Sequence, residues 1–577
     1  MKWLIYFLLL VGVLKAVTFE CKAKGESVIV EARNLKDAKL RAFTDLNRVN
    51  NKIKLEDINC TIKKLKKFNK AQQNSDSLKM ESISLGVSPA PQMLIKRKSK
   101  MSFGYREDLS GEEYSSFSDN SFKEPTTSPL STFSVDVDTA SYGIVRRYIM
   151  QNSSFPPKGA IRIEEMINYF DYDYPSPKEE SFNILAKVGE SIWNKNHKIL
   201  QIGVQAKKID SSKLPPSNLV FLIDVSGSMG APNKLPLLKR AFKLLVNQLR
   251  ATDTVSIVVY AGSSGVVLNG VRGDKKSKIL KALENLRAGG STAGGAGINL
   301  AYKIAKENFI KGGNNRVILA TDGDFNVGVR SESQLIDLIE KEKNSGIYLT
   351  VLGFGMGNFK DSKMEKLADK GNGNYGYIDN LLEAKKLLVE QMSGTLFTVA
   401  KDVKVQVEFN PLMVKKYRLI GYVNRKMANE DFKNDKKDAG DVGAGHSVTV
   451  LYELELKDKN SSTTSPLKYQ TLTPSKEAKS DEIATLKLRF KAPDSNSSKE
   501  IKKVIKTDSS EIKDKDFYFA QAVAGFGMIL RDSEYKGDLT IEKVLKIAKE
   551  NRGEDKNGYR AEFIRVLEKA QLLKQTK

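Results

Sequence analysis

The stretch Asn218-Leu-Val-Phe-Leu-Ile-Asp-Val-Ser-Gly-Ser-Met229 decides how this 577-residue chain folds. Its first half is apolar and rich in branched side chains, which is typical of a strand buried on both faces of a parallel sheet. Its second half carries three oxygen-bearing side chains at a spacing of two, namely Asp224, Ser226 and Ser228. One carboxylate and two hydroxyls at the carboxyl end of a strand favour a hard cation, Mg²⁺ before Ca²⁺.

Two later segments carry further oxygen atoms to the same edge. Residues 289–295 form a glycine-rich stretch that contains Thr292, and residues 316–321 form a second apolar strand followed by Asp322. Ligands of open α/β sheets bind outside the carboxyl ends of the strands, so we expect these side chains to meet. The alternation of apolar strands with helical patterns from 218 to 397 predicts a doubly wound α/β domain.

The order Asp224-x-Ser226-x-Ser228, Thr292, Asp322 resembles the metal-ion-dependent adhesion site of von Willebrand factor type A (VWA) domains. The resemblance implies direct metal contact by the two serines and the threonine, with the two aspartates close by or bound through water. It implies Mg²⁺ as the cofactor, with Mn²⁺ or Ca²⁺ as substitutes. It also implies an open coordination position that takes a Glu or Asp carboxylate from a partner protein.

The flanks of this domain extend the resemblance to most of the chain, about residues 132–575. Two segments before it are similar to the part that precedes the VWA domain in the bacterial YfbK-like family, and three after it resemble the C-terminal domain of that family. These segments are residues 133–142, 164–170, 418–422, 438–446 and 534–537.

The N-terminus predicts export. Met1–Ala16 has a positive start and a short apolar run, as in a secretory signal peptide, with an uncleaved anchor as the alternative. We therefore expect the periplasm or the cell surface of a bacterium, with membrane contact only through an uncleaved leader. The only two cysteines, Cys21 and Cys60, are predicted to form a disulfide there, the alternative being two unpaired thiols.

Composition divides the remaining chain into parts. We predict a small module at 17–67, a flexible linker at 68–131, a VWA-preceding segment with helices and sandwich strands at 132–210, the VWA domain at 211–400, and a C-terminal β plus helical domain at 401–577.

Alternating apolar residues indicate antiparallel strands within 403–490, and we predict that they join the strands of 181–204 in one β-sandwich into which the VWA domain is inserted. Asp138 and Asp361 are predicted to cap helices.

Charge and residue usage exclude several function classes. The net charge of +24 is spread along the chain without aromatic-basic motifs, so no nucleic-acid partner is predicted. Two histidines and two cysteines exclude Cys/His zinc sites. A phosphate loop is absent, and Asp224-Val-Ser226 lacks the second carboxylate of the Asp-x-Asp pair that phosphoaspartate-forming phosphatases use. His446, the one nearby base for a serine nucleophile, is predicted to be a turn residue.

The sequence therefore favours a binding function over catalysis. We predict an exported protein-binding, adhesion or assembly module that is not an enzyme. A Mg²⁺-dependent hydrolase and a purely structural envelope protein are the alternatives.

Overall fold

The computed structural model divides the chain into two compact units, Met1–Ser102 and Phe103–Lys577. In the first unit it describes residues 17–23, 26–32 and 58–62. In the second it describes 111–576 except for 117, 136–137, 211–212, 292–293, 324–331, 358, 392–396, 458–474, 494, 508–511 and 513. The predicted signal peptide lies outside the described residues.

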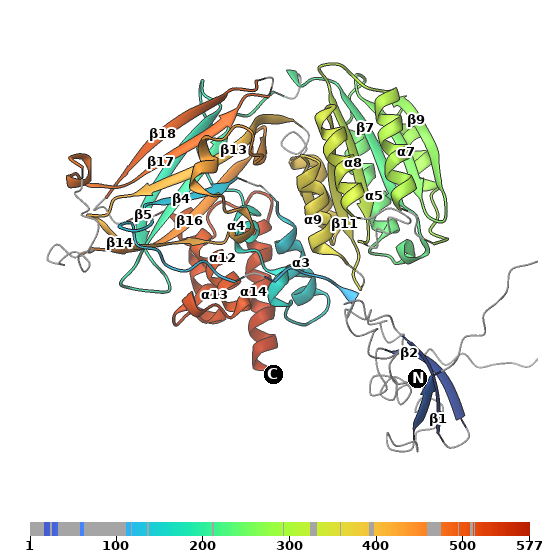
Figure 1. The fold of residues 1–577 in the computed structure, drawn as a ribbon, viewed down its shortest axis with the longest axis horizontal. Helices are drawn as coiled ribbons and strands as arrows, with labels where there is room; N and C mark the ends of the chain where they lie inside the picture. The colour runs from blue at the N-terminus through green and yellow to red at the C-terminus, as the bar shows by residue number, and fades with distance from the viewer. Residues whose placement is uncertain are drawn as a thin grey trace, which may run out of the picture. The chain divides into compact units, whose positions relative to one another are not determined.

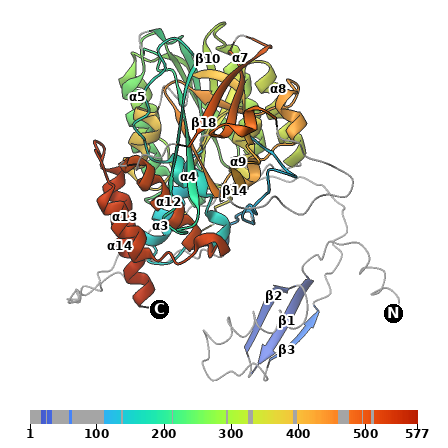
Figure 2. The same ribbon diagram turned by 90° about the vertical axis from the view of Figure 1, so that its left-hand side faces the viewer.

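The first unit contains a three-stranded antiparallel sheet (Figure 2). Strand β1 (Val17–Ala23) lies between β2 (Glu26–Ala32) and β3 (Asn59–Ile62). Cys21 is directly opposite Cys60 in the register of β1 and β3. Cys21 is buried and disulfide-bonded, and Cys60 is the only other cysteine of the chain.

A six-stranded sheet forms the centre of the VWA domain, as predicted. Its order is β12 (Tyr375–Ile378), β11 (Ile347–Phe354), β10 (Asn314–Thr321), β7 (Ser217–Asp224), β8 (Thr254–Tyr260) and β9 (Ser264–Arg272). Neighbouring strands are parallel except β9, which is antiparallel to β8. Strand β7 lies inside the sheet and all its residues are buried, which explains its uninterrupted apolar sequence.

Helices cover both faces of this sheet (Figure 1). Alternate residues of β7 enter different cores, because successive side chains of a strand point to opposite faces. Leu219, Phe221 and Ile223 share one core with α5 (Leu235–Gln248) and α6 (Lys276–Glu284). Val220 and Leu222 share the other with α7 (Gly294–Glu307), α8 (Glu332–Asn344) and α9 (Asp361–Lys370). Helix α10 (Leu381–Lys385) packs beside α5.

The two sheets of the β-sandwich confirm the predicted insertion. One sheet has the order β14 (Val414–Ile420), β16 (Ser447–Leu456), β6 (Lys198–Ala206), β5 (Phe182–Glu190). The other has the order β15 (Gly440–Gly443), β13 (Thr398–Phe409), β17 (Glu482–Lys491), β18 (Ser498–Lys506), with β4 (Leu130–Ser134) paired to β13. Because β6 pairs with β16 and both sheets share one core, strands from either side of the VWA domain build one sandwich.

A layer of helices also combines both flanks (Figure 2). Helices α3 (Ala140–Met150) and α4 (Ile163–Asn168) share an aromatic-rich core with α12 (Lys515–Arg531), α13 (Ile541–Glu550) and α14 (Tyr559–Gln575). Within the described part of the chain, none of the helices has the length and apolar character that crossing a bilayer requires.

The predicted flexible linker extends too far. From residue 111 the chain follows the folded body: the Glu113 amide donates to the Phe359 carbonyl at 2.9 Å, and buried Asn120 donates to the carbonyls of Leu419 and Gly421. Strand β4 begins at Leu130. This segment is held by backbone hydrogen bonds, by polar side chains such as Asn120 and by the buried ion pair of Glu112 with Arg147, so its composition resembles that of a linker.

Candidate metal centre

Asp224 ends β7 with its carboxylate fixed by three donors. Its Oδ2 accepts hydrogen bonds from the Tyr260 hydroxyl and the Thr321 hydroxyl, both at 3.1 Å. Its Oδ1 accepts from the Ser226 amide at 2.9 Å. The donors come from β8, β10 and the turn after β7, so adjacent parallel strands hold one buried carboxylate at the carboxyl edge of the sheet.

Ser226 and Ser228 follow in the turn that leaves the strand. Their Oγ atoms lie 3.1 Å apart, and one hydroxyl donates to the other. Ser226 is buried, whereas Ser228 is exposed in the short 3₁₀ turn η6 (Gly227–Gly230). The pair therefore offers two neighbouring hydroxyl oxygens close to Asp224, one of them on an exposed residue.

The glycine-rich loop packs against this turn through its backbone. The Gly227 amide donates to the Gly290 carbonyl at 2.9 Å, and the Gly289 amide donates to the Val225 carbonyl at 2.8 Å. Gly290 has a φ of +82°, a conformation that favours glycine. Thr292, the predicted ligand of this loop, lies outside the described residues, so its hydroxyl is not placed.

The second aspartate of the prediction, Asp322, follows β10 and is buried. The Lys234 ammonium lies 3.2 Å from its Oδ2. Burial raises the pKa of Asp224 to about 6 against the opposing hydrogen bonds from Ser226, and the negative charge of Asp322 adds to the rise. Two carboxylates thus act on one another at this edge, which a cation would relieve.

The donor set fits a hard divalent cation. Carboxylate and hydroxyl oxygens are the ligands that Mg²⁺ and Mn²⁺ prefer, and no described thiol or imidazole lies among these residues to favour a softer metal. Ser226 and Ser228 would contact the ion directly, with Asp224 and Asp322 beside it. The ion would supply a positive centre that can accept an external oxygen ligand.

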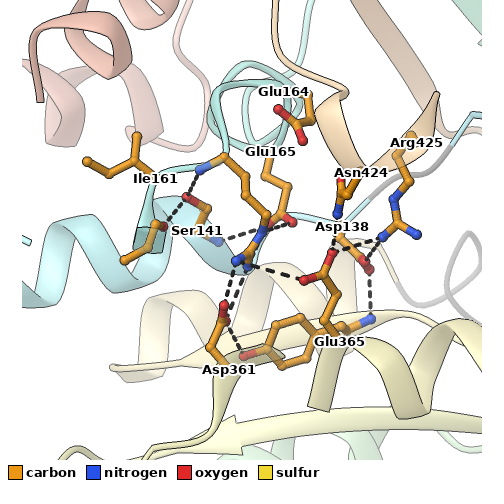
Figure 3. Close-up of polar contacts among 12 residues, drawn as sticks. Asp138, Ser141, Ile161, Glu164, Glu165, Asp361, Glu365, Asn424 and Arg425 are labelled. Carbon is orange, nitrogen blue, oxygen red and sulfur yellow. Dashed lines mark hydrogen bonds and ion pairs between the residues drawn. The ribbon is translucent and has the colours of Figure 1, made fainter. Parts of the chain in front are cut away.

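A second group of carboxylates, which sequence reasoning missed, lies where the VWA domain meets its flanks (Figure 3). Carboxylate oxygens of Asp138, Glu165 and Glu365 lie within 4.8 Å of one another. Arginines fill the space between them: Arg162 binds Glu165 and Asp361, and Arg425 binds Asp138 and Glu365 at 3.3 and 3.1 Å. We call this group, with Arg162 and Arg425, the junction cluster.

The junction cluster corrects the predicted helix caps. The residues that precede α3 and α9, Thr139 and Lys360, make no side-chain capping hydrogen bond. Asp138 instead accepts from the Tyr375 amide at 2.8 Å, and Asp361 accepts from the Tyr375 hydroxyl at 2.8 Å. Both aspartates therefore join separate parts of the fold.

His446 takes no part in the metal centre. Neither of its ring nitrogens has a hydrogen-bond partner, and burial lowers its pKa to about 4. The charged groups that act on it are Asp171 and Lys386, which both lie outside the metal centre.

Comparison with known proteins assigns the parts of the chain. The model described as "von Willebrand factor type A domain" matches residues 218–391, and the model described as "Uncharacterized protein YfbK, C-terminal" matches 394–573. A model described as "von Willebrand factor" matches 108–201. VWA domains generally mediate protein interactions and often bind a divalent metal at this type of site.

Relatives were found among known sequences and structures. YfbK of Escherichia coli strain K12 is 44% identical over 468 residues, which cover 79% of this chain and 80% of that protein. Protein sll0103 of a Synechocystis species is 30% identical over 208 residues, covering 35% of this chain and 47% of that protein. The solved von Willebrand factor type A structure from Catenulispora acidiphila covers 66% of this chain and 89% of its own, with 16% identity and a TM-score of 0.37. On its similarity to the Escherichia coli protein, the chain belongs to the YfbK family of VWA-domain proteins.

Proposed function

We propose that this protein is an exported protein-binding module that captures a Glu or Asp carboxylate of a partner protein through Mg²⁺. The observation that carries the proposal is the arrangement of Ser226 and Ser228, whose hydroxyls lie 3.1 Å apart next to buried Asp224, with Ser228 exposed to solvent. Hydroxyl ligands are neutral, so they leave much of the positive charge of the ion available to an external carboxylate. The predicted binding function thus requires no rearrangement of Asp224, Ser226 and Ser228.

Export is part of the proposal and rests on the N-terminus. The positive start and apolar run of Met1–Ala16 are those of a secretory leader. The disulfide bond of Cys21 supports the same destination, because such bonds persist in oxidising compartments. The partner would then be a protein of the bacterial envelope or surface.

The experiment is a pull-down from an envelope extract with residues 17–577 as bait, in Mg²⁺ and in EDTA. Ser228→Ala is the informative variant: Ser228 is exposed and donates or accepts one hydroxyl contact, whereas Asp224 holds three donors inside the fold. Ser263→Ala, an exposed serine in the turn between β8 and β9, is the matched control.

We expect one protein to be retained by the wild type and Ser263→Ala in Mg²⁺, and to be lost in EDTA and with Ser228→Ala. Equal retention in EDTA would contradict the proposal, because a carboxylate cannot bind through an ion that has been removed.

A further inference from the structure

A lysine lies inside the candidate metal centre. Lys234, which directly precedes α5, is 5% exposed, and its ammonium is 3.2 Å from Oδ2 of Asp322. Burying an ammonium group costs free energy unless a partner offsets it. A positive charge beside a cation site also opposes the cation, so its position there calls for a physical reason.

The loop after β11 holds the lysine in place. Gly355 has a φ of +78°, and a Cβ atom there would lie 2.4 Å from Cε and 2.5 Å from Cγ of Lys234. The aliphatic stem of the lysine therefore occupies the space that a side chain at position 355 would take. The same loop touches the segment that follows β10 and carries Asp322, because a Cβ atom at Gly323 would lie 2.6 Å from the Lys360 amide nitrogen.

Residues outside the VWA domain fix this loop. The Gly355 carbonyl accepts a hydrogen bond from Nη1 of Arg147 at 3.1 Å, and the Gly357 amide donates to Oε1 of Glu112 at 2.9 Å. Arg147 and Glu112 form an ion pair at 2.7 Å in which both side chains are 1% exposed. The segment that precedes the domain thus reaches Lys234 through one loop.

The charges of the centre give the lysine a role. Among the described residues of the centre, Asp224, Asp322 and Lys234 sum to −1, so a bound divalent cation raises this sum to +1. Without the lysine the same described residues and the cation would sum to zero. Lys234 therefore weakens the attraction for the metal and strengthens the attraction of the loaded centre for an external carboxylate.

We propose that Lys234 is a positioning residue that shifts the specificity of the centre from holding its metal to capturing a carboxylate, and that the Glu112–Arg147 pair keeps it beside Asp322. The inference rests on the proposed function, since it concerns the same site.

The test is Mn²⁺ affinity of the full chain, measured by electron paramagnetic resonance of the free ion. Lys234→Met keeps the stem and removes the charge, so we expect Mn²⁺ to bind about tenfold more tightly. Lys234→Arg keeps the charge and should stay within about threefold of the wild type. A lysine with a merely structural role predicts the opposite sign, because a disturbed site loses metal.

Two further measurements complete the test. Acetate should bind the Mn²⁺-loaded Lys234→Met protein about threefold more weakly than it binds the Mn²⁺-loaded wild type. Water-proton relaxation measures this binding. Glu112→Gln should tighten Mn²⁺ in the same direction as Lys234→Met, since it releases the loop. Glu562→Gln, which removes a buried carboxylate from Arg146 instead, is its control and should bind Mn²⁺ as the wild type does.

The outcomes separate this inference from the proposed function. A wild type that binds no Mn²⁺ sinks the proposed function. If the wild type binds Mn²⁺ but Lys234→Met or Glu112→Gln binds it equally or more weakly, only the role given to Lys234 is overturned. The proposed function then stands.

Discussion

The metal centre lies within the VWA domain and the junction cluster lies where that domain meets its flanks; both contain buried carboxylates, but they differ in their donors. In the junction cluster the charged partners are guanidinium groups: Arg162 binds Asp361 and Glu165, and Arg425 binds Asp138, Glu365 and Asp369. In the metal centre the donors to Asp224 are two hydroxyls and one amide.

That difference decides which group is suited to a metal. A guanidinium has only donors and fixes a carboxylate in a two-pronged contact, so it neutralises the charge and adds no ligand. A serine hydroxyl also carries lone pairs, so Ser226 and Ser228 can turn them toward a cation. The number of carboxylates is therefore a poor guide to a metal site, and the chemistry of their neighbours is a better one.

The largest expected effect comes from breaking the junction cluster. Arg162→Met leaves the Asp361 carboxylate buried without its cation and Glu165 without its hydrogen-bond donor, which costs about 3–5 kcal/mol of the free energy of unfolding. Urea unfolding of the full chain measures it.

Arg272→Met is the control, because the Arg272–Asp274 pair is solvent-exposed and should contribute less than about 1 kcal/mol. A loss in Arg162→Met no larger than that of the control would show that the junction cluster does not hold the domains together.

The two groups should respond to neutral substitutions in opposite ways. Asp224→Asn keeps an oxygen acceptor for its donors but removes the charge, so Mn²⁺ affinity should fall by about 100-fold while the free energy of unfolding changes by about 1 kcal/mol or less. Asp361→Asn should lower stability and leave Mn²⁺ affinity unchanged, because it weakens the pair with Arg162. Electron paramagnetic resonance and urea unfolding on both variants provide the comparison, and the reverse pattern would mean that we have interchanged the two roles.

The sequence predicts the parts of the fold that depend on local pattern. The apolar run of β7 and the spacing of Asp224, Ser226 and Ser228 require only a buried strand and a turn. The change to a period of two after residue 402 predicts the sandwich strands, and their distance from residues 181–204 suggests the insertion.

Residues that act through distant partners escape this reasoning. Asp138 and Asp361 have the residue type and the sequence position of helix caps. Only the fold brings them to Arg425 and Arg162. In the sequence nothing distinguishes Lys234 from the other lysines of the chain. Its place beside Asp322 depends on how the segments that follow β10 and β11 pack in the fold. Residues 111–131 have a linker's composition because backbone, polar and charged groups such as Asn120 and Glu112 hold them, rather than apolar side chains.

The smallest expected effect is a pH dependence of the junction cluster. Burial raises the pKa of Glu165 to about 8 against the attraction of Arg162, and repulsion by Glu365 and Asp361 adds to the rise. The folded protein therefore holds a proton at Glu165 that the unfolded chain releases near its ordinary value of 4.5. Stability from this group is complete below that value and is lost as pH rises through about 8.

Glu165→Gln removes this titration, so its free energy of unfolding should fall less than that of the wild type between about pH 7 and about pH 8.5, by about 1 kcal/mol. Glu164→Gln is the control, because Glu164 is also buried but its Oε2 lies beside Gly421. Urea unfolding at the two pH values tests the prediction. Equal losses in all three proteins would mean that Glu165 is ionised at neutral pH and that the two arginines alone balance the junction cluster. The junction cluster would then hold no proton at Glu165 at neutral pH. It would differ from the metal centre only in its donors, which are arginines in the junction cluster and hydroxyls in the metal centre.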